Sequence, residues 1–191
     1  MPHKNRATIT KDWRPAFNDL EPKRWSPSPS AGECSRIQHT KMPNTLPKPQ
    51  VRTVLDRLFA TAAQDDETPR WQRPGLSWGT ATAQERADAS KSAYMPISRQ
   101  AGDLLYILVR AKRPNTVIEF GTSYGISTIY LAAAVADNST GHVVTTELSA
   151  TKVLGARANL EEARLADRVT ILLGDASAEP AGTILSTRRA V

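Results

Sequence analysis

The chain has 191 residues, which is enough for one domain with appendages but short for a two-domain enzyme. Hydrophobic residues make up 40% and charged residues 23%, and no apolar run approaches the roughly 20 residues that cross a bilayer. The single cysteine, Cys34, excludes an internal disulfide, and His3, His39 and His142 lack the spacing of zinc ligands. No segment has the pattern of a secretory signal, so we expect a cytoplasmic protein.

Residues 1–50 differ in composition from the rest of the chain. They hold 8 of the 13 prolines and 9 Lys or Arg against 4 Asp or Glu, whereas residues 51–191 carry 16 against 15. Because no helical or strand period persists here, we predict a disordered basic tail. Trp13 and Trp25 among the basic residues would suit a nucleic-acid arm, but the composition favours a solvated tail without that partner. Met42 would also be a plausible N-terminus of the protein, in which case residues 1–41 would be a mis-called start.

Two helices are predicted in an N-terminal helical region, residues 51–93. The first covers Val51–Gln64, where six apolar residues share one helical stripe. They are Val51, Val54, Leu55, Leu58, Phe59 and Ala62. The second covers Thr80–Lys91, which is rich in alanine and has Thr82 or Thr80 as a candidate N-cap. No apolar stripe identifies the surface against which this second helix packs.

Helices and strands alternate after Ser98. Ser98 is a candidate N-cap for a helix that ends at Arg113, with an apolar stripe at Ala101, Leu104, Leu105, Leu108 and Val109. Apolar, β-branched runs then predict three strands, with a helix after each of the first two. The strands are 116–120, 142–147 and 168–173, and the helices are 126–136 and 150–164. This order is typical of an α/β fold with one mononucleotide-binding half of a doubly wound parallel sheet.

Polar groups follow the ends of all three predicted strands. The turn from Gly121 to Gly125 leads from the first strand into a helix, and such turns present free backbone N–H groups and the positive end of the helix dipole. Glu147 ends the second strand, where a carboxylate can accept hydrogen bonds from ribose hydroxyls. Asp175 follows the third strand and could meet an adenine amino group. Each signal is weak alone, but together they predict a nucleoside site.

Five segments of the sequence match one family pattern. They are Tyr94–Ser98, Val117–Thr128, Thr146–Leu148, Asn159–Val169 and Gly174–Ala176. Together they resemble the class I S-adenosylmethionine-dependent O-methyltransferases, in the branch similar to catechol O-methyltransferase. The resemblance covers about residues 94–176. It implies a Rossmann-like methyltransferase fold, S-adenosyl-L-methionine as cofactor, and transfer of its methyl group to the hydroxyl of a small molecule.

The resemblance also implies roles for the matching residues. Glu119, Gly121, the turn formed by Thr122, Ser123, Tyr124 and Gly125, and Ser127 would line the methionine end of the cofactor. Glu147 would hold the ribose, Leu148 would pack on the adenine, and Asp175 with Ala176 would border its amino edge. Met95 and Ile97 match the segment that closes over the cofactor, although ordinary core packing would explain them equally well.

The C-terminal residues 177–191 do not match the family pattern. Complete members have about seven strands in the order 3-2-1-4-5-7-6, and this sequence supplies only strands 3, 2 and 1. Metal-dependent relatives use carboxylates on later strands to hold a divalent metal such as Mg, and these are missing here. We therefore expect a truncated chain with compromised activity, an irregular C-terminal tail, no acceptor pocket or metal site, and no identifiable catalytic residue. Strand 1 would then have an unprotected edge, and a second copy of the chain could cover it in a homodimer.

Two competing interpretations remain. An NAD-binding Rossmann oxidoreductase is disfavoured because Ser123 replaces the middle glycine of the G-x-G-x-x-G pattern, and because Glu119 precedes the first glycine. A non-catalytic interaction protein would use the basic tail to bind nucleic acid and the half-sheet as a scaffold.

Overall fold

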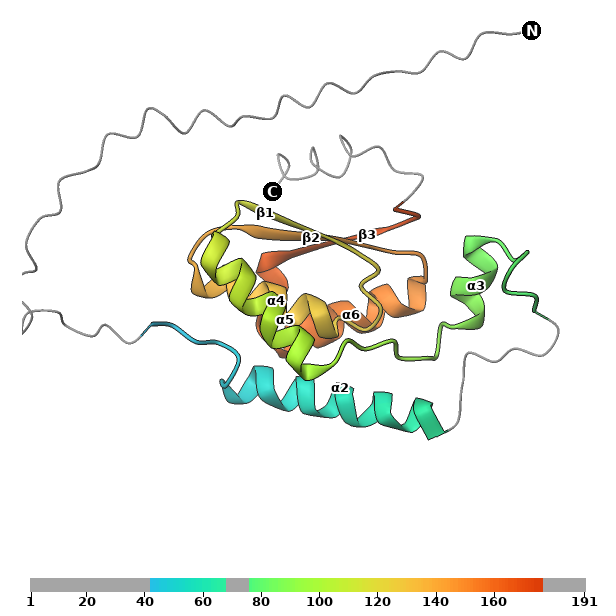
Figure 1. Cartoon of the computed structure of the whole chain (residues 1–191), viewed down its shortest axis with the longest axis horizontal. Helices are drawn as coiled ribbons and strands as arrows, with labels where there is room; N and C mark the ends of the chain where they lie inside the picture. Colours follow the sequence, from blue (N-terminus) through green and yellow to red (C-terminus); the bar gives the residue numbers. More distant parts are fainter. Residues whose placement is uncertain (1–41, 68–75, 177–191) are drawn as a thin grey trace, which may run out of the picture. The chain divides into compact units, whose positions relative to one another are not determined.

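The structure is a computed structural model, described here for residues 42–67 and 76–176 (Figure 1). The described elements are α2 (Pro49–Glu67), α3 (Ala83–Ala89), α4 (Arg99–Lys112), β1 (Thr116–Phe120), α5 (Ile126–Asp137), β2 (His142–Glu147), α6 (Ala150–Glu162), the short 3-10 helix η1 (Ala166–Arg168) and β3 (Val169–Leu173). The basic tail up to residue 41 and the C-terminal residues 177–191 lie outside the described residues. The helices and strands agree with the predicted ones to within three residues at each end.

The three strands form one parallel sheet in the order β1-β2-β3. Phe120 is the register partner of Thr146, and Glu147 is the partner of Leu173. All three strands therefore end at the same edge of the sheet. Helices α4, α5 and α6 lie along one face of this sheet, and α2 packs against α5 and α6 as an outer layer (Figure 1). The predicted α/β, Rossmann-like fold class is confirmed.

The ordered unit begins before residue 51, where the tail was expected to end. Thr45 is buried, and its backbone N–H and hydroxyl both donate to the carboxylate of Asp137 at the end of α5, at 2.8 and 2.5 Å. The hydroxyl of Tyr106 on α4 donates to the same carboxylate at 2.7 Å. Asp137 is itself buried, so these three donors compensate the cost of removing a carboxylate from water. One side chain thus joins α4 and α5 to the segment before α2.

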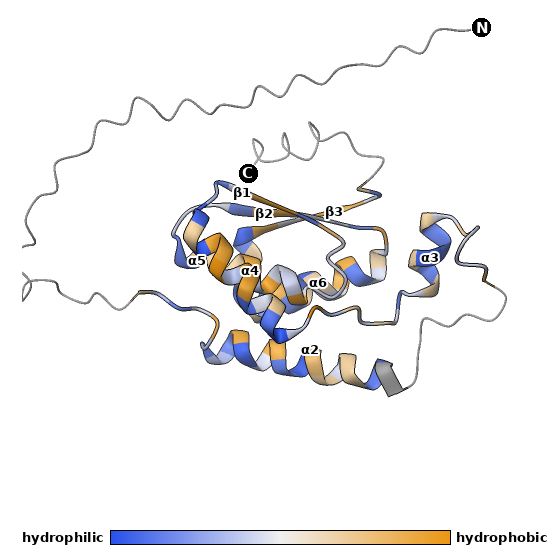
Figure 2. Ribbon diagram, in the orientation of Figure 1, coloured by the Kyte–Doolittle hydropathy of each residue, from blue (hydrophilic) through white to orange (hydrophobic). Residues whose placement is uncertain are grey.

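The predicted apolar stripe of α2 forms the outer part of the core. Val51, Val54 and Leu58 have no solvent exposure, and Figure 2 shows the hydrophobic residues of α2 on the side that faces the other helices. Helix α5 is buried almost all round, because it lies between β2, α4 and α2. Its alanines at 132–134 have no exposed surface, and their small side chains let neighbouring elements approach closely.

The packing face of α4 agrees only in part with the stripe predicted for it, since Val109 lies in the core and Leu105 packs against it as expected. Gly102 and Val109 are buried, whereas Leu104 and Leu108 are about half exposed, at 56% and 50%. The reason is Gly102: a Cβ there would come within 2.5 Å of the ring of Tyr130 on α5. The close approach of the two helices at this glycine turns the predicted leucine stripe partly toward solvent.

We predict that Tyr106→Phe lowers the free energy of unfolding by about 1 kcal/mol, since it removes one hydrogen bond from the buried Asp137. Burial and the bond to Asp137 raise the pKa of Tyr106 to about 12. The stabilising contribution of the neutral phenol is complete below the ordinary tyrosine pKa of about 10 and is lost as the pH rises through about 12. Chemical denaturation of the parent protein and the variant between about pH 8 and about pH 12 measures both the loss of stability in Tyr106→Phe and its dependence on pH. An alkaline stability profile shared by the variant and the parent protein would contradict this account.

Candidate functional site

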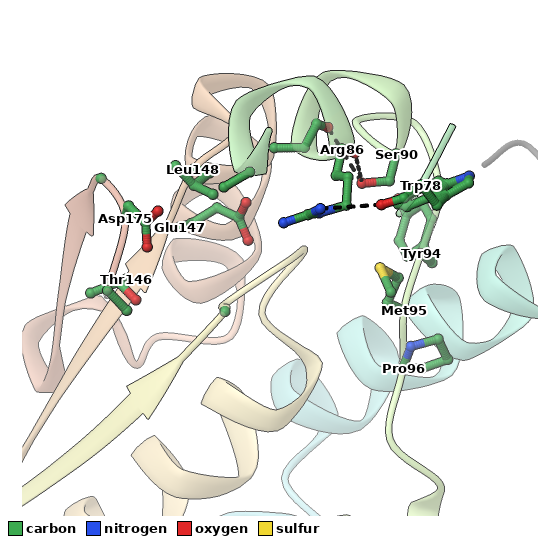
Figure 3. Close-up of a pocket in the computed structure, with 15 residues that line it drawn as sticks. Trp78, Arg86, Ser90, Tyr94, Met95, Pro96, Thr146, Glu147, Leu148 and Asp175 are labelled. Carbon is green, nitrogen blue, oxygen red and sulfur yellow. Dashed lines mark hydrogen bonds between the residues drawn. The ribbon is translucent and has the colours of Figure 1, made fainter. Parts of the chain in front are cut away.

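A cavity of about 900 Å³ opens at the carboxyl ends of the strands (Figure 3). It lies where the free ends of parallel strands and a glycine turn commonly form ligand sites. One wall comes from the strand ends, with Gly121, Glu147 and Asp175. The opposite wall comes from the segment 78–96, including α3. A volume of this size suits a ligand as large as a nucleoside derivative.

The turn after β1 is fixed to β2 by backbone hydrogen bonds. The N–H groups of Gly121 and Thr122 both donate to the carbonyl of Thr146, each at 3.0 Å. Gly121 has φ +87° and Gly125 has φ +90°, which glycine adopts readily. Ser123 also has a left-handed backbone, φ +48°, at a cost of about 1 kcal/mol for a residue with a side chain. The turn therefore carries one strained residue directly beside the cavity.

The carboxylate of Glu147 compensates this strain. Its Oε2 accepts the backbone N–H of Ser123 at 2.8 Å, and its Oε1 accepts the N–H of Ser149 at 2.9 Å. The side chain is thus held between the turn after β1 and the start of α6. Each oxygen keeps a further lone pair, because a carboxylate can accept about four hydrogen bonds. Glu147 presents these remaining acceptor positions to the cavity (Figure 3).

A cation lies beneath this turn. Lys152 on α6 is 3% exposed, and its Nζ lies 5.9 Å from the centre of the Tyr124 ring. Burial lowers the pKa of Lys152, and the nearby charges of Glu147 and Asp65 oppose that shift. The Tyr124 ring stacks on Tyr94 with 4.1 Å between the centroids. This stack connects the turn to the segment that carries Met95.

A second cavity, of about 20 Å³, lies beside the first. Its lining includes Ile97, Ser123 and Ser127, and it shares Tyr94, Met95 and Gly121 with the larger cavity. The hydroxyl oxygen of Ser123 is buried and has no hydrogen-bond partner among the described residues. An unpaired buried hydroxyl costs about 1–3 kcal/mol, so this atom is suited to meet a polar group of a ligand.

The residues predicted from the sequence fall into three groups. Those at the larger cavity are Met95, Gly121, Glu147, Leu148, Asp175 and Ala176. Those that line the smaller cavity are Met95, Ile97, Gly121, Thr122, Ser123, Tyr124 and Ser127. Glu119 and Gly125 line neither cavity.

Glu119 is instead bonded to hydroxyl groups of the protein. Its carboxylate accepts from Ser127 Oγ at 2.6 Å, Thr128 Oγ1 at 2.6 Å and Thr145 Oγ1 at 2.8 Å. Two of these donors belong to the first turn of α5, where the positive end of the helix dipole also stabilises the negative charge of Glu119. Glu119 therefore fixes the start of α5. It is connected to the lining of the smaller cavity through Ser127, and through Thr145, which shares a hydrogen bond with Thr122.

Apart from Met95, the residues of the wall opposite Glu147 were not among the predicted site residues. This wall includes Trp78, Ala83, Arg86, Ala87 and Ser90. Thr82 caps α3 and forms a capping box with Glu85, which agrees with the predicted cap. A signal for the lining was present in the spacing of Ala83, Ala87 and Ser90, which places small side chains on one helical face. Such a face is also common in ordinary packing, so the pattern alone does not identify a cavity.

Residues 42–67 and 76–176 contain no group of three or more His, Cys, Asp or Glu arranged to hold a metal ion. In the same ranges, no helix combines the length and the apolar character needed to cross a membrane.

The glycine turn, the acidic strand end and the parallel sheet are features of a Rossmann-like α/β unit. Residues 118–188 match the family model described as a methyltransferase domain. Among curated proteins, the chain is 38% identical over 96 residues to a catechol O-methyltransferase of Mycobacterium tuberculosis. The aligned part is 50% of this chain and 43% of that protein. These two matches confirm the resemblance to class I O-methyltransferases.

Solved structures are also similar to this chain. A cofactor-bound protein from MTB is 31% identical with a TM-score of 0.42, and the match covers 66% of this chain and 55% of that one. An O-methyltransferase from Bacillus cereus in complex with SAH is 25% identical with a TM-score of 0.45, over 72% and 58% of the two chains. The chain thus spans about half the length of the proteins it matches.

We predict that Glu119→Gln lowers the free energy of unfolding by about 2 kcal/mol, because an amide cannot accept from all three hydroxyl donors. Glu161→Gln, an exposed change on α6, is the matched control and should leave stability unchanged. Chemical denaturation compares the two. Equal stability of both variants would show that the Glu119 network contributes nothing to the fold.

Proposed function

We propose that this chain binds S-adenosyl-L-methionine and forms the cofactor-binding part of an O-methyltransferase that acts on a small-molecule hydroxyl. The observation that carries this proposal is Glu147, held by two backbone N–H groups at the edge of a nucleoside-sized cavity. The similarity to a methyltransferase domain, to a catechol O-methyltransferase and to a structure containing SAH supports it.

The lining residues suit the parts of this cofactor. The free lone pairs of Glu147 would accept the ribose hydroxyls, and Leu148 would contact the adenine. Asp175 and Ala176 would lie along the adenine edge. The buried, unpartnered Ser123 hydroxyl suits the amino or carboxylate group of the methionine end, and Ser127 lines the same small cavity.

When bound, the cofactor supplies an activated methyl group for displacement by an acceptor oxygen. The contribution of this chain is to orient that group, and alignment alone can lower a barrier by roughly 7 to 11 kcal/mol. Met95, which is 68% exposed and borders both cavities, is placed to cover the bound cofactor. We assign no residue to deprotonation of the acceptor, because no described side chain at the cavity has a geometry that identifies it as the base.

A nicotinamide dinucleotide suits this site less well. Its diphosphate needs close approach to the backbone at the middle position of the glycine turn. Ser123 occupies that position, and its hydroxyl is buried there beside the smaller cavity. The side chain of Ser123 would meet the diphosphate where a glycine leaves room.

The first test is calorimetric titration of the full chain with S-adenosylhomocysteine and, separately, with NAD. We expect binding of the former only. Glu147→Gln should weaken the binding of S-adenosylhomocysteine by about tenfold to a hundredfold, because hydrogen bonds to a charged acceptor are lost and the turn at Ser123 loosens.

The matched control for this titration is Glu161→Gln, which changes an exposed carboxylate on α6 and should keep the parental affinity. Stronger binding of NAD than of S-adenosylhomocysteine would refute the methyltransferase assignment. Equal affinities of the Glu147 variant and the parent would refute the proposed role of Glu147.

We further propose that two copies of the chain associate through β1. No described strand pairs with the outer edge of β1, and Ile118 and Phe120 are 42% and 67% exposed. Helix α4, which packs on α5, adds Leu104 and Leu108 to the exposed apolar residues. An unpaired strand edge with apolar side chains is a template for pairing with a second copy, and a twofold axis closes such a contact.

Phe120→Lys should convert the dimer to a monomer, since a charge on an edge strand opposes pairing. Leu173→Lys is the matched control, because Leu173 is a 60% exposed apolar residue on β3, at the other edge of the sheet. Sedimentation velocity reports the masses. A monomeric parent protein at high concentration, or a dimer that only Leu173→Lys disrupts, would refute association through β1.

A further inference from the structure

Arg86 on α3 reaches into the larger cavity from the wall opposite Glu147 (Figure 3). Its Nη1 donates to two carbonyl groups, those of Trp78 at 3.2 Å and Ala81 at 2.5 Å. Both bonds lie at one corner of the guanidinium. They fix the position of the group at the cavity and restrict its rotation.

The rest of the Arg86 guanidinium has no protein acceptor within the described ranges. No described carboxylate forms an ion pair with it, and no hydrogen bond from Nε or Nη2 is present there. The adjacent Glu85 does not neutralise it, because that carboxylate accepts from the N–H and hydroxyl of Thr82, both at 2.8 Å. These bonds lower the pKa of Glu85. Arg86 thus offers oriented cationic donors to the cavity.

Two walls of the cavity therefore have opposite hydrogen-bonding character. Glu147 can only accept hydrogen bonds, and Arg86 can only donate them. A ribose hydroxyl does both: its hydrogen is donated to one group, and its oxygen accepts from another. A ribose diol between the two walls would satisfy Glu147 through its hydrogens and Arg86 through its oxygens.

We propose that Arg86 is a second ribose-binding residue, which donates hydrogen bonds to the hydroxyl oxygens whose protons Glu147 accepts. This inference rests on the proposed function, because it takes the adenosine part of the cofactor as the occupant of the larger cavity. In this proposal α3 does more than form part of the cavity wall, because it also supplies a hydrogen-bond donor to the ribose. It also accounts for the anchoring of the guanidinium, since a fixed fork loses less rotational freedom when a ligand binds.

The proposal is tested by a thermodynamic cycle between protein and ligand. Calorimetry gives the dissociation constants of the parent chain and of Arg86→Gln for S-adenosylhomocysteine and for its 2′-deoxy and 3′-deoxy analogues. We expect Arg86→Gln to weaken S-adenosylhomocysteine binding by about tenfold, the effect of losing one charge-assisted hydrogen bond. For at least one deoxy analogue the same substitution should change the affinity by less than about twofold, because its partner oxygen is already missing.

Two further variants control the cycle. Arg52→Gln removes an exposed arginine on α2 and should retain the parental affinity for all ligands. Arg86→Lys keeps the positive charge but loses the fork, and it should bind S-adenosylhomocysteine with an affinity between those of the parent and Arg86→Gln. Thermal denaturation of each variant without ligand establishes that α3 and its surroundings remain folded.

Each outcome decides the proposal. An equal loss of affinity for all three ligands would overturn it, because that pattern reports only a looser 78–81 loop. Parental affinity in Arg86→Gln together with weakened binding in Glu147→Gln would overturn it and leave the proposed function intact. Failure of the parent chain to bind S-adenosylhomocysteine would overturn both.

Discussion

The bridge that Glu147 forms between two backbone N–H groups is the interaction on which the site depends. It connects the strained Ser123 in the turn after β1 to Ser149 at the start of α6. The parallel register makes this possible, because Phe120 lies opposite Thr146 and brings the turn beside the end of β2. A carboxylate at this point lowers the cost of an unfavourable backbone conformation and faces the cavity. The Glu147 side chain therefore both stabilises the turn and provides acceptor positions for a ligand.

The layers beneath the sheet keep this bridge in place. Glu119 fixes the first turn of α5 through three hydroxyl groups, and Asp137 fixes its last residue to α4 and to Thr45. Helix α5 is thus restrained at both ends by carboxylates that accept three hydrogen bonds each, that of Asp137 buried and that of Glu119 partly buried. Such fully bonded polar groups favour one arrangement of the elements, because any shift would leave a buried donor without an acceptor. The turn 121–125 leads directly into α5, so the restraint on α5 also restrains this turn at the cavity.

The order of the elements could be predicted from local patterns. Apolar β-branched runs identified the strands, and Ser98 and Thr82 cap α4 and α3 as expected. What sequence could not show were contacts set by tertiary packing. The stripe predicted for α4 is only partly buried: Val109 lies in the core, whereas Leu104 and Leu108 are about half exposed, because the close approach of α4 to Tyr130 occurs at Gly102. The hydrogen bonds that Glu119 accepts from Ser127 and Thr128 were likewise not predictable from sequence. No sequence pattern identified Arg86 as a site residue, because its proposed role in ribose binding depends on how α3 faces the strand ends.

The most direct test of the central claim is a crystal structure of the chain with S-adenosylhomocysteine. The account predicts ribose hydroxyl oxygens within about 3 Å of the Glu147 carboxylate, with the bonds to Ser123 and Ser149 retained. A ligand bound with its ribose away from Glu147, or a Glu147 side chain that leaves Ser123 to reach the ligand, would contradict it.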